Sequence, residues 1–300
     1  MESKQLKEQF GKNLIINENL SKYNWFNLGG PADIFFRPEN KDQLIDFLKK
    51  IKKFDLTINV IGAGSNTLIR DSGIKGVVIK LSSKFSQIKL ISENIIEVGA
   101  AALDRNVSDF AKENSLGGME FLSCIPGSVG GAIIMNSGCY GSEISQILSS
   151  IKILDRNGVE KELTRDKIDF FYRGSNIPEE YLILSAKLKG ILSSKELIKK
   201  KQEEFIKRKK ISQPSRIKTG GSTFKNHKEK KAWKLIKESG CDKFSIGDAK
   251  ISEKHSNFFI NNGKAKTSDV EQLINKVKRE VYKKTGINLE LEIKIIGDEK

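Results

Sequence analysis

One stretch of the sequence, from Cys124 to Gly141, constrains the fold more than any other. It reads CIPGSVGGAIIMNSGCYG and places five glycines and Pro126 around a short apolar run. Glycine adopts positive φ and lets another backbone or a ligand approach closely, so this spacing indicates backbone shaped around a close neighbour. On glycine count alone, two interpretations stand equal. The N–H groups could hold a phosphate, or the stretch could be a tight turn that packs against a helix or strand.

The composition favours a water-soluble chain of more than one domain. Its 300 residues exceed the usual size of one hydrophobic core, which predicts two or three domains. No apolar run approaches the roughly 18 residues of a membrane-spanning helix, and the first residues, MESKQLKEQFGKN, lack the apolar segment of a signal peptide. Three cysteines without a CxxC pair argue against a disulfide framework and a zinc site. We therefore expect a cytosolic protein with no metal and no membrane insertion.

The formal net charge of +15 is concentrated in one segment. Between Lys195 and Lys231, 14 lysines and arginines stand against four glutamates, a net charge of +10. Such a segment could bind nucleic acid, but apolar residues recur in it at helical spacing. A solvated face of an amphipathic helix is the better interpretation, so we expect no nucleic-acid partner. The positive field would also attract small anionic substrates.

A second glycine motif, GAGSN at residues 62–66, follows a predicted strand. It nearly matches the dinucleotide fingerprint G-x-G-x-x-G, but Thr67 replaces the third glycine and residues 71–73 break any helix that follows. No acidic residue that could bind a ribose stands about 20 residues further on. The sequence thus excludes a Rossmann site here. What remains is a polar turn whose N–H groups, with the side chains of Ser65 and Asn66, can contact a phosphate.

Turn signals and hydrophobic periodicity predict alternating strands and helices up to about residue 193. Asn40 can cap the helix that follows it, and residues 156–158 carry the Asn-Gly signal of a hairpin. Gly117 and Gly118 should end a helix that contains Val107. The expected strands cover residues 32–37, 58–61, 76–81, 88–90, 95–98 and 181–188, besides the two strands of the hairpin.

The composition changes near residues 191–200, where we place a domain boundary. The last hundred residues predict a smaller α+β unit, with one helix ended by Gly240 and another that begins near Thr267 and ends before Gly286. The closing segment, INLELEIKIIG, alternates apolar and polar residues. This alternation predicts a strand that carries on one face Asn288, Glu290, Glu292 and Lys294.

Six segments of the chain belong together as a set. In order they read GAGSN, IPGSVGGAIIMNSGCYG, YRGS, GGSTFKN, GDAKISEKHSNFFIN and LEIKIIG. Each is a weak signal alone, but in this order they resemble the flavin-dependent UDP-N-acetylenolpyruvoylglucosamine reductases of bacterial cell-wall synthesis, from about Asn24 to Gly297. The chain departs from the family pattern at Cys124, in SGC before Tyr140, and at His227. Its short length resembles the shorter of the family's two subtypes.

The resemblance implies an α+β fold in two functional parts. An extension over residues 1–23 would precede an FAD-binding unit of the vanillyl-alcohol-oxidase-like (PCMH-type) class over 24–193, with two subdomains divided near residue 82. A smaller α+β substrate-binding domain would cover 194–300. Both histidines lie in the last third, so we expect the FAD to be bound non-covalently. We also expect the chain to act as a monomer on small-molecule substrates.

The implied reaction has two steps. NADPH reduces FAD, and the reduced flavin gives a hydride to the enolpyruvyl group of UDP-N-acetylglucosamine-enolpyruvate, which yields UDP-N-acetylmuramate for peptidoglycan synthesis. The alkene accepts a hydride only if its conjugated carboxylate takes up the developing negative charge. In the family pattern Arg173 holds that carboxylate, Glu292 donates to the enediolate, and Ser222, helped by Lys225, protonates the second carbon.

The resemblance also implies the groups that bind the cofactor and the substrate. The FAD diphosphate and its surroundings would be held by residues of the two glycine turns, namely Gly62, Ala63, Gly64, Ser65, Asn66, Pro126, Gly127, Ser128, Gly130, Gly131, Asn136 and Gly138. The UDP-bearing substrate would contact Tyr172, Lys225 and Asn226, because phosphate sites use cationic and amide donors.

Each catalytic residue also has an interpretation without a catalytic role. From the local sequence alone, Arg173 fits an ion pair better, and Glu290 and Glu292 both fit a solvated strand face. Ser222 fits a Gly-Gly turn at least as well as an acid. Only the match to EIKIIG selects Glu292 over Glu290. His255 is better explained as a hydrogen-bonded structural residue than as a base.

Two other functions remain open at this point. The chain could be another FAD-dependent oxidoreductase of the same flavin-binding class, acting on a small alcohol or hydroxy acid without a requirement for UDP. It could also bind nucleic acid through its lysines, which predicts salt-sensitive binding and a colourless preparation.

Overall fold

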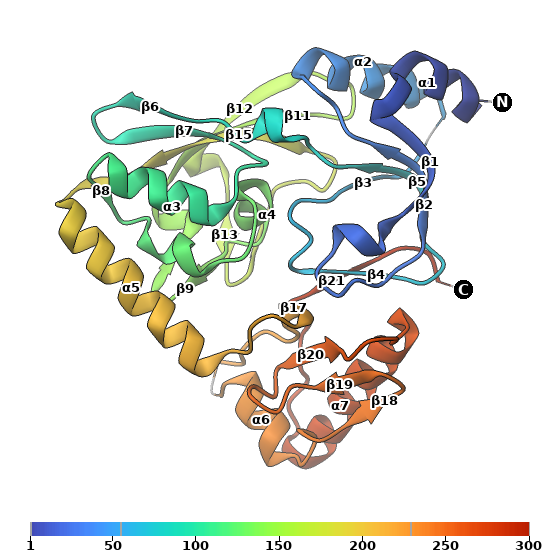
Figure 1. The fold of residues 1–300 in the computed structure, drawn as a ribbon, viewed down its shortest axis with the longest axis vertical. Coiled ribbons are helices and arrows are strands. Elements are labelled where there is room, and N and C mark those ends of the chain that lie inside the picture. The colour runs from blue at the N-terminus through green and yellow to red at the C-terminus, as the bar shows by residue number, and fades with distance from the viewer. Residues whose placement is uncertain (1, 55, 229, 300) are drawn as a thin grey trace. The chain divides into compact units, whose positions relative to one another are not determined.

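The computed structural model describes residues 2–54, 56–228 and 230–299. The chain forms two compact units and passes between them several times (Figure 1). The first unit contains Met1–Ile16, Ile34–Ala63 and Gly76–Lys209. The second unit contains Asn17–Asp33, Gly64–Lys75 and Lys210–Lys300. The limits predicted from the sequence for the functional domains, at residues 1–23, 24–193 and 194–300, stay predictions.

A five-stranded antiparallel sheet forms the centre of the first unit, in the order β12-β11-β15-β7-β6. Its strands are β6 (Ile88–Ser92), β7 (Ile95–Gly99), β11 (Leu148–Leu154), β12 (Glu160–Thr164) and β15 (Leu182–Lys189). The predicted hairpin joins β11 to β12. Its turn is held by Asp155, whose carboxylate accepts hydrogen bonds of 2.9 Å from the N–H groups of Asn157 and Val159.

The helices of this unit pack beside its sheets. They are α1 (Glu2–Phe10), α2 (Lys41–Ile51), α3 (Asp104–Glu113), α4 (Val129–Ile134) and α5 (Lys195–Ser212). Asn40 caps α2 as predicted, because its side chain accepts a hydrogen bond from the N–H of Gln43 at 2.9 Å. The prediction that Gly117 ends α3 is wrong. The helix ends at Glu113, and Ser115 turns the chain with a φ of 58° before the glycine is reached.

Two apolar clusters hold the first unit together. One lies on the central sheet and includes Ile151 and Ala186 with α4, and the other joins α1 and α2 to neighbouring strands. In the second cluster the rings of Phe36 and Phe47 stack with centroids 3.9 Å apart, and Phe10 meets Phe36 edge-on at 5.2 Å. Burial of such a side chain contributes roughly 1.5–3 kcal/mol.

Smaller strand pairings complete this part of the chain. A four-stranded sheet has the order β1-β2-β5-β3, and three of its strands continue along the chain into the second unit. Its strands are β1 (Leu14–Asn19), β2 (Pro31–Phe36), β3 (Ile58–Val60) and β5 (Ile74–Ile79). Short antiparallel pairs join β8 (Leu116–Gly117) to β16 (Ile191–Leu192), β9 (Gly138–Cys139) to β10 (Ser142–Glu143), and β13 (Phe170–Phe171) to β14 (Gly174–Ser175).

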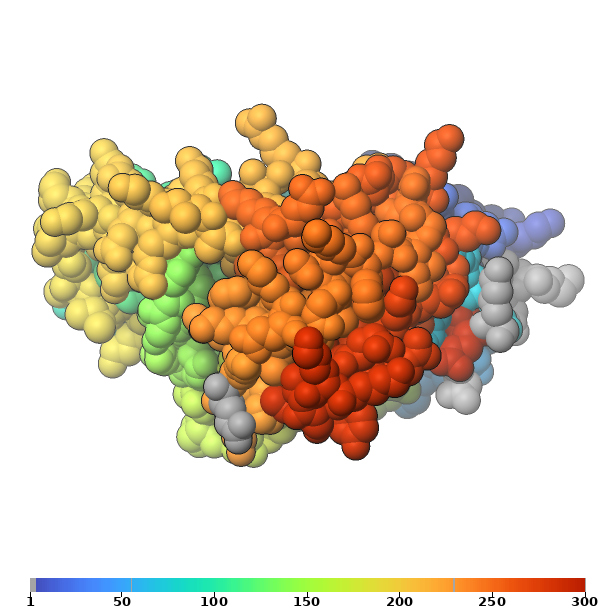
Figure 2. Space-filling model, turned by 90° about the horizontal axis from the view of Figure 1, so that it is seen from below, coloured from blue at the N-terminus to red at the C-terminus, as the bar shows by residue number. Residues whose placement is uncertain are grey.

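The second unit is a smaller α+β structure, and Figure 2 shows part of its surface in orange and red. Its antiparallel sheet has the order β17-β20-β19-β18, and a parallel pair joins β4 to β21. The strands are β4 (Thr67–Ile69), β17 (Lys218–Ser222), β18 (Ser245–Ile246), β19 (Ala249–Ile251), β20 (Phe258–Asn261) and β21 (Lys294–Ile296). The helices are α6 (Ala232–Glu238) and α7 (Thr267–Thr285).

The apolar face predicted for α7 is buried. Val270, Leu273 and Val277 are each fully buried in the core of the second unit. Gly286 ends the helix with a left-handed φ of 71°, and its N–H donates to the carbonyl of Tyr282 at 2.8 Å. None of the helices in the described residues is long and apolar enough to cross a membrane.

The closing segment forms less strand than the alternation predicts. Only Lys294–Ile296 form a strand, and they pair with β4. The residues before it bond instead to the chain after β17, where Leu291 makes an isolated antiparallel bridge with Phe224. The two glutamates therefore differ, since Glu290 is exposed whereas Glu292 is half-buried.

Candidate functional site

The two predicted flavin turns meet in the first unit. The N–H of Ala63 donates to Ser128 Oγ at 3.2 Å, and a Cβ on Gly62 would lie only 2.4 Å from the same oxygen. Lys80 donates from Nζ to the carbonyl of Gly62. Burial, assisted by the charge of Arg37, lowers the pKa of Lys80. A side chain at position 62 would displace the Ser128 hydroxyl group, and Lys80, which the sequence pattern did not single out, places an amine beside the turn.

The remainder of the GAGSN turn is held within the second unit. Gly64 has a φ of 70°, and a Cβ there would meet the carbonyl oxygen of Tyr23 at 2.0 Å. Asn66 donates from Nδ2 to the carbonyl of Glu292 at 3.0 Å. The amide nitrogen that the sequence suggested for a phosphate therefore also anchors the segment that carries Glu292.

The Cys124–Gly141 stretch contains the short helix α4, with Ser128 at its N-cap position. The N–H groups of Val129 and Gly130 donate to the carbonyls of Ala102 and Ala100, both at 2.9 Å. These two amides already donate to backbone carbonyls, as expected if the stretch is a tight turn that packs against its neighbours. A phosphate at this turn would need other groups of the stretch.

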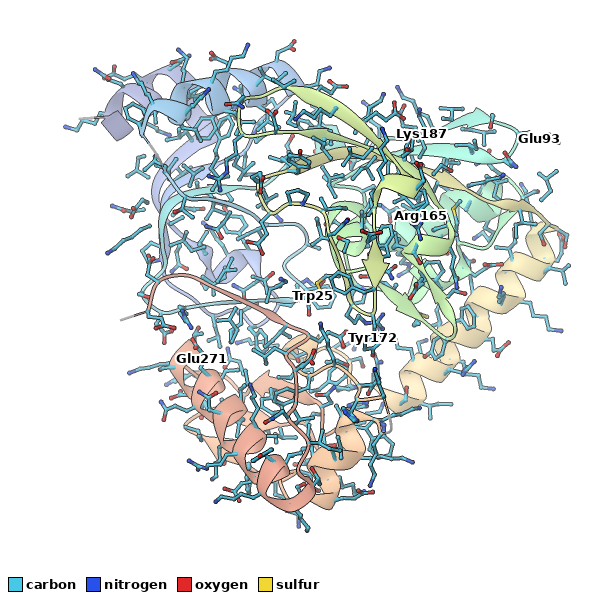
Figure 3. All side chains as sticks on the ribbon, turned by 180° about the vertical axis from the view of Figure 1, so that it is seen from behind. Trp25, Glu93, Arg165, Tyr172, Lys187 and Glu271 are labelled. Carbon is cyan, nitrogen blue, oxygen red and sulfur yellow. The ribbon has the colours of Figure 1, made fainter. Side chains whose placement is uncertain are left out.

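The second half of the same stretch supports the hairpin that carries Tyr172 and Arg173. Asn136 donates from Nδ2 to the carbonyl of Phe171 at 3.2 Å. Arg173 donates from Nη2 to the carbonyl of Gly138 at 2.7 Å, and its guanidinium carbon lies 5.0 Å from the ring centroid of Tyr172, which is labelled in Figure 3. Arg173 has a φ of 57°, a conformation that non-glycine residues seldom adopt. The structure thus brings these four predicted site residues together.

In the second unit, Ser222 and Glu292 lie on adjoining segments. Ser222 is the last residue of β17, and the N–H of the next residue, Thr223, donates to the carbonyl of Asn257 at 2.8 Å. The N–H of Glu292 donates to the carbonyl of Thr223 at 2.9 Å. Asn257 also brackets Phe224, accepting from its N–H at 3.0 Å and donating to its carbonyl at 2.8 Å. A network of backbone and amide bonds therefore positions both predicted catalytic residues.

Lys225 and Asn226 lie beside these residues with partners of their own. The N–H of Lys225 donates to the carbonyl of Glu290 at 2.8 Å, and its ammonium lies 3.8 Å from the Glu290 carboxylate, whose side chain is 77% exposed. Asn226 accepts a hydrogen bond from the N–H of Ala232 at 3.1 Å, at the start of α6. The turn that follows closes with a hydrogen bond of 3.1 Å from the N–H of His227.

His255 has the surroundings of a structural residue. Its Nδ1 accepts a hydrogen bond from the N–H of Asn257 at 3.3 Å, and its ring meets Phe258 with centroids 4.8 Å apart. Burial lowers the pKa of His255, which favours the neutral ring.

A buried carboxyl group, Asp104 at the start of α3, also adjoins the second flavin turn. Neither carboxyl oxygen has a hydrogen-bond partner among the described residues, and the side chain is completely buried. A Cβ on Gly127 would lie 2.4 Å from Asp104 Oδ2, so this glycine makes room for the carboxyl group. Burial raises the pKa of Asp104 well above its ordinary value. No motif indicated this residue, because its isolation arises only from packing.

The raised pKa of Asp104 predicts a pH-dependent stability. The folded protein holds the proton that the unfolded chain releases, so the stabilisation is complete below the unfolded pKa and is lost as pH rises through the folded pKa. Asp104→Asn should therefore flatten the decline of the unfolding free energy with rising pH, by about 1.4 kcal/mol for each unit of pKa difference. Urea unfolding of the flavin-loaded protein at a series of pH values measures this. Asp109→Asn, on the same helix but with a side chain that is 49% exposed, should leave the profile unchanged. Parallel profiles for Asp104→Asn and the unmodified protein would contradict the prediction.

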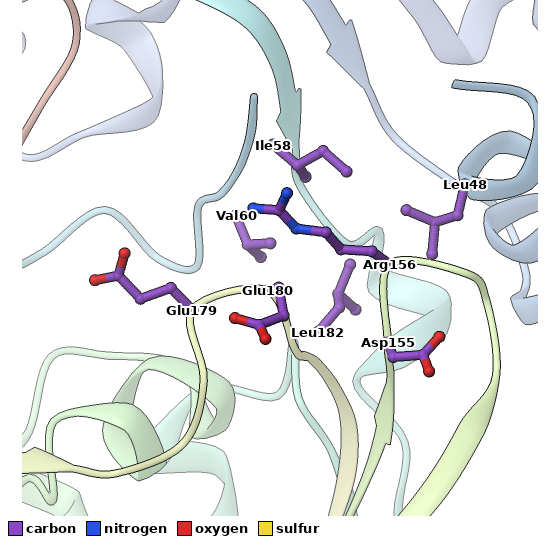
Figure 4. Close-up of a pocket in the computed structure, with 8 residues that line it drawn as sticks. All are labelled: Leu48, Ile58, Val60, Asp155, Arg156, Glu179, Glu180 and Leu182. Carbon is purple, nitrogen blue, oxygen red and sulfur yellow. The ribbon is translucent and has the colours of Figure 1, made fainter. Parts of the chain in front are cut away.

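A separate pocket in the first unit contains none of the predicted site residues (Figure 4). It lies between β3, α2 and the turn after β11, and Arg156 extends across it toward Ile58 (Figure 4). The carboxylates and the one arginine that line this pocket do not form the cationic site that a diphosphate requires.

Comparisons with known proteins match two parts of the chain to protein families. Residues 32–164 match the model of an FAD binding domain, and residues 213–296 match that of the UDP-N-acetylenolpyruvoylglucosamine reductase C-terminal domain. The chain is 45% identical over 298 residues to the UDP-N-acetylenolpyruvoylglucosamine reductase of Pelagibacter ubique (strain HTCC1062), covering 98% of each chain. It is 43% identical over 284 residues to that of Gluconobacter oxydans (strain 621H), covering 95% of this chain and 92% of the relative.

A solved structure extends the match to three dimensions. The crystal structure of UDP-N-acetylenolpyruvylglucosamine reductase from Thermus caldophilus superposes with a TM-score of 0.82 at 31% identity, over 94% of this chain and 97% of that one. Together with the FAD binding domain, this fold defines a flavin-dependent oxidoreductase. It confirms the predicted α+β class with an FAD-binding unit. More narrowly, the chain belongs to the UDP-N-acetylenolpyruvoylglucosamine reductase family. An oxidoreductase for small alcohols is not favoured, since the C-terminal region matches this family's own domain.

Proposed function

We propose that the chain reduces the enolpyruvyl group of UDP-N-acetylenolpyruvoylglucosamine to give UDP-N-acetylmuramate, with NADPH as reductant, in peptidoglycan precursor synthesis. The observation that supports it most is the pairing of the segment after Ser222 with the segment of Glu292, which holds an alcohol and a carboxyl group on neighbouring backbone. We further propose that it works as a cytoplasmic monomer.

The turn around Gly62 fits a diphosphate-bearing flavin. A side chain at position 64 would meet backbone, one at position 62 would displace the Ser128 hydroxyl group, and Lys80 supplies a positive charge beside the turn. When bound there non-covalently, FAD supplies hydride transfer from NADPH to the alkene. Gly62, Gly64 and Ser128 would then shape the binding surface, with the remaining residues of the two glycine turns around them.

The residues that act on the substrate have separate tasks. Arg173 would hold the carboxylate with two parallel hydrogen bonds, because a guanidinium keeps its charge and matches the carboxylate geometry. Glu292, as the half-buried member of the glutamate pair, would donate to a carboxylate oxygen as negative charge develops. Ser222 would give its hydroxyl proton to the carbon beside that carboxylate, with the ammonium of Lys225 stabilising the alkoxide. Tyr172, Lys225 and Asn226 would contact the UDP-bearing part.

Spectroscopy in two additions tests this function. The purified protein should be yellow, anaerobic NADPH should bleach the flavin absorbance, and UDP-N-acetylenolpyruvoylglucosamine should restore it. A small alcohol or hydroxy acid should have no such effect. A colourless protein that binds DNA or RNA in a salt-dependent way would refute the proposal, as would absorbance that the substrate fails to restore.

A further inference from the structure

Two cysteines of the first unit lie together beside the second flavin turn. Cys124 ends the short 3-10 helix Glu120–Cys124, and Cys139 lies in β9, which packs against that helix. The two thiols are neighbours, and each is the largest influence on the pKa of the other. The sulfur of Cys139 also lies 3.5 Å from the carbonyl of Phe121, and that of Cys124 lies 3.7 Å from Ser123 Oγ. Two thiols from segments 15 positions apart thus share one polar cluster.

A lysine completes this cluster. Lys209 on α5 donates from Nζ to the carbonyl of Cys124 at 2.7 Å, which places its positive charge near the sulfur. The hydrogen bond from Cys139, followed by the Ser123 hydroxyl and the Lys209 charge, lowers the pKa of the Cys124 thiol against the opposing effect of burial. The same hydrogen bond, with burial, raises the pKa of Cys139. The arrangement therefore favours a thiolate on Cys124 beside a protonated Cys139.

We propose that Cys124 and Cys139 form a redox-reactive dithiol, in which peroxide oxidises Cys124 and Cys139 then closes a reversible disulfide. The pairing of a thiolate with a neighbouring thiol is the arrangement of redox-sensing cysteines. A disulfide in a protein of a reducing compartment is as a rule transient and regulatory rather than structural.

The chemistry balances with hydrogen peroxide as the oxidant. The Cys124 thiolate attacks one peroxide oxygen, the O–O bond breaks, and the products are Cys124 sulfenic acid and hydroxide, so the sulfur loses two electrons to the peroxide. The Cys139 thiol then attacks the sulfenic sulfur. An S–S bond forms, the S–O bond breaks, and water leaves with the thiol proton. In sum, two thiols and one peroxide yield one disulfide and two waters.

Disulfide formation would act on the hairpin that carries Tyr172 and Arg173. A covalent S–S bond is shorter than a contact between two separate thiols, so closure draws β9 toward the 3-10 helix. Gly138 adjoins Cys139 and accepts the 2.7 Å hydrogen bond from Arg173, so this arginine would move with it. Tyr140, on the other side of Cys139, stacks on Phe205 of α5 with centroids 5.0 Å apart. Since a displacement near 1 Å can lower a rate by about 10²-fold, we expect oxidation to slow the reductase by about 10- to 100-fold. This effect on rate rests on the proposed role of Arg173.

The test treats the flavin-loaded protein with hydrogen peroxide and follows thiols, peptides and activity in parallel. The unmodified protein should lose two thiols, give a peptide in which Cys124 and Cys139 are linked, and lose activity that dithiothreitol restores. Cys241→Ser, which removes the buried cysteine of the second unit, should behave in the same way. Cys139→Ala should keep its basal activity, form no linked peptide, and retain its activity at a peroxide dose that slows the unmodified protein, because no disulfide can draw β9 toward the helix.

Two results would overturn the proposal. One is the absence of the linked peptide at peroxide concentrations that oxidise Cys124. The other is a linked peptide in a protein whose activity is unchanged. Thiol counting and peptide mapping need no substrate, so they report on the dithiol even if the chain proves to catalyse another reaction. Failure of the proposed function would instead show as a protein inactive before any peroxide is added.

Discussion

Ser222→Ala should leave reduction of the bound flavin by NADPH at its normal rate and slow reoxidation by the enolpyruvyl substrate by about 10²- to 10⁴-fold. This is the range that a positioned acid contributes to proton transfer. The methyl group of alanine cannot supply the proton that the substrate carbon needs after hydride addition. Position 222 ends β17 through backbone pairing with Phe258, so loss of the hydroxyl group keeps this contact. Stopped-flow absorbance measures the two half-reactions separately.

The control for this variant is Ser245→Ala. Ser245 lies on β18 of the same sheet and is exposed, so its loss should change neither half-reaction. An equal loss of both half-reactions in Ser222→Ala would point to damaged flavin binding and would remove Ser222 from the acid role. An unchanged rate of substrate reduction would do the same.

Elements whose signals lie within a few residues could be predicted from the sequence. The apolar spacing of α7, the left-handed Gly286 after it, and the cap at Asn40 all depend on neighbours along the chain, and the structure confirms each. The hairpin at 156–158 is of the same kind, because an Asn-Gly turn needs no distant partner.

Contacts between distant segments could not be predicted in this way. The strand expected over the whole closing segment shortens to Lys294–Ile296, since the preceding residues bond to residues 223–225 instead of continuing a ladder. Lys80 beside Gly62, and Arg173 on the carbonyl of Gly138, likewise depend on packing between segments far apart in sequence.

The candidate site shows the same difference between local signals and contacts formed on folding. The resemblance to a family selected Ser222, Arg173 and Glu292, whereas local patterns alone left each with an ordinary structural explanation. Their catalytic roles stay predictions. Asp104 and the Cys124–Cys139 pair escaped notice, because isolation of a carboxyl group and contact between thiols appear only when the chain has folded.

Glu292→Ala should slow substrate reduction by about 10²- to 10³-fold and leave flavin reduction by NADPH unchanged. Loss of one donor at a developing anion has an effect of this size. Two hydrogen bonds hold the segment: the N–H of Glu292 donates to the carbonyl of Thr223, and the carbonyl of Glu292 accepts from Asn66 Nδ2. Both bonds involve the backbone of Glu292, so they survive truncation of its side chain. The variant therefore tests the carboxyl group rather than the fold, and thermal unfolding should show a melting temperature close to that of the unmodified protein.

The matched control is Glu290→Ala, two residues away on the same segment. Glu290 has a side chain that is 77% exposed and pairs with the ammonium of Lys225, 3.8 Å away. An exposed pair of this kind contributes little, so Glu290→Ala should keep the rate within about threefold. If Glu290→Ala slowed substrate reduction and Glu292→Ala did not, the catalytic carboxyl group would be Glu290. Equal and small effects in both variants would show that stabilisation of the developing charge rests on Arg173 without a glutamate.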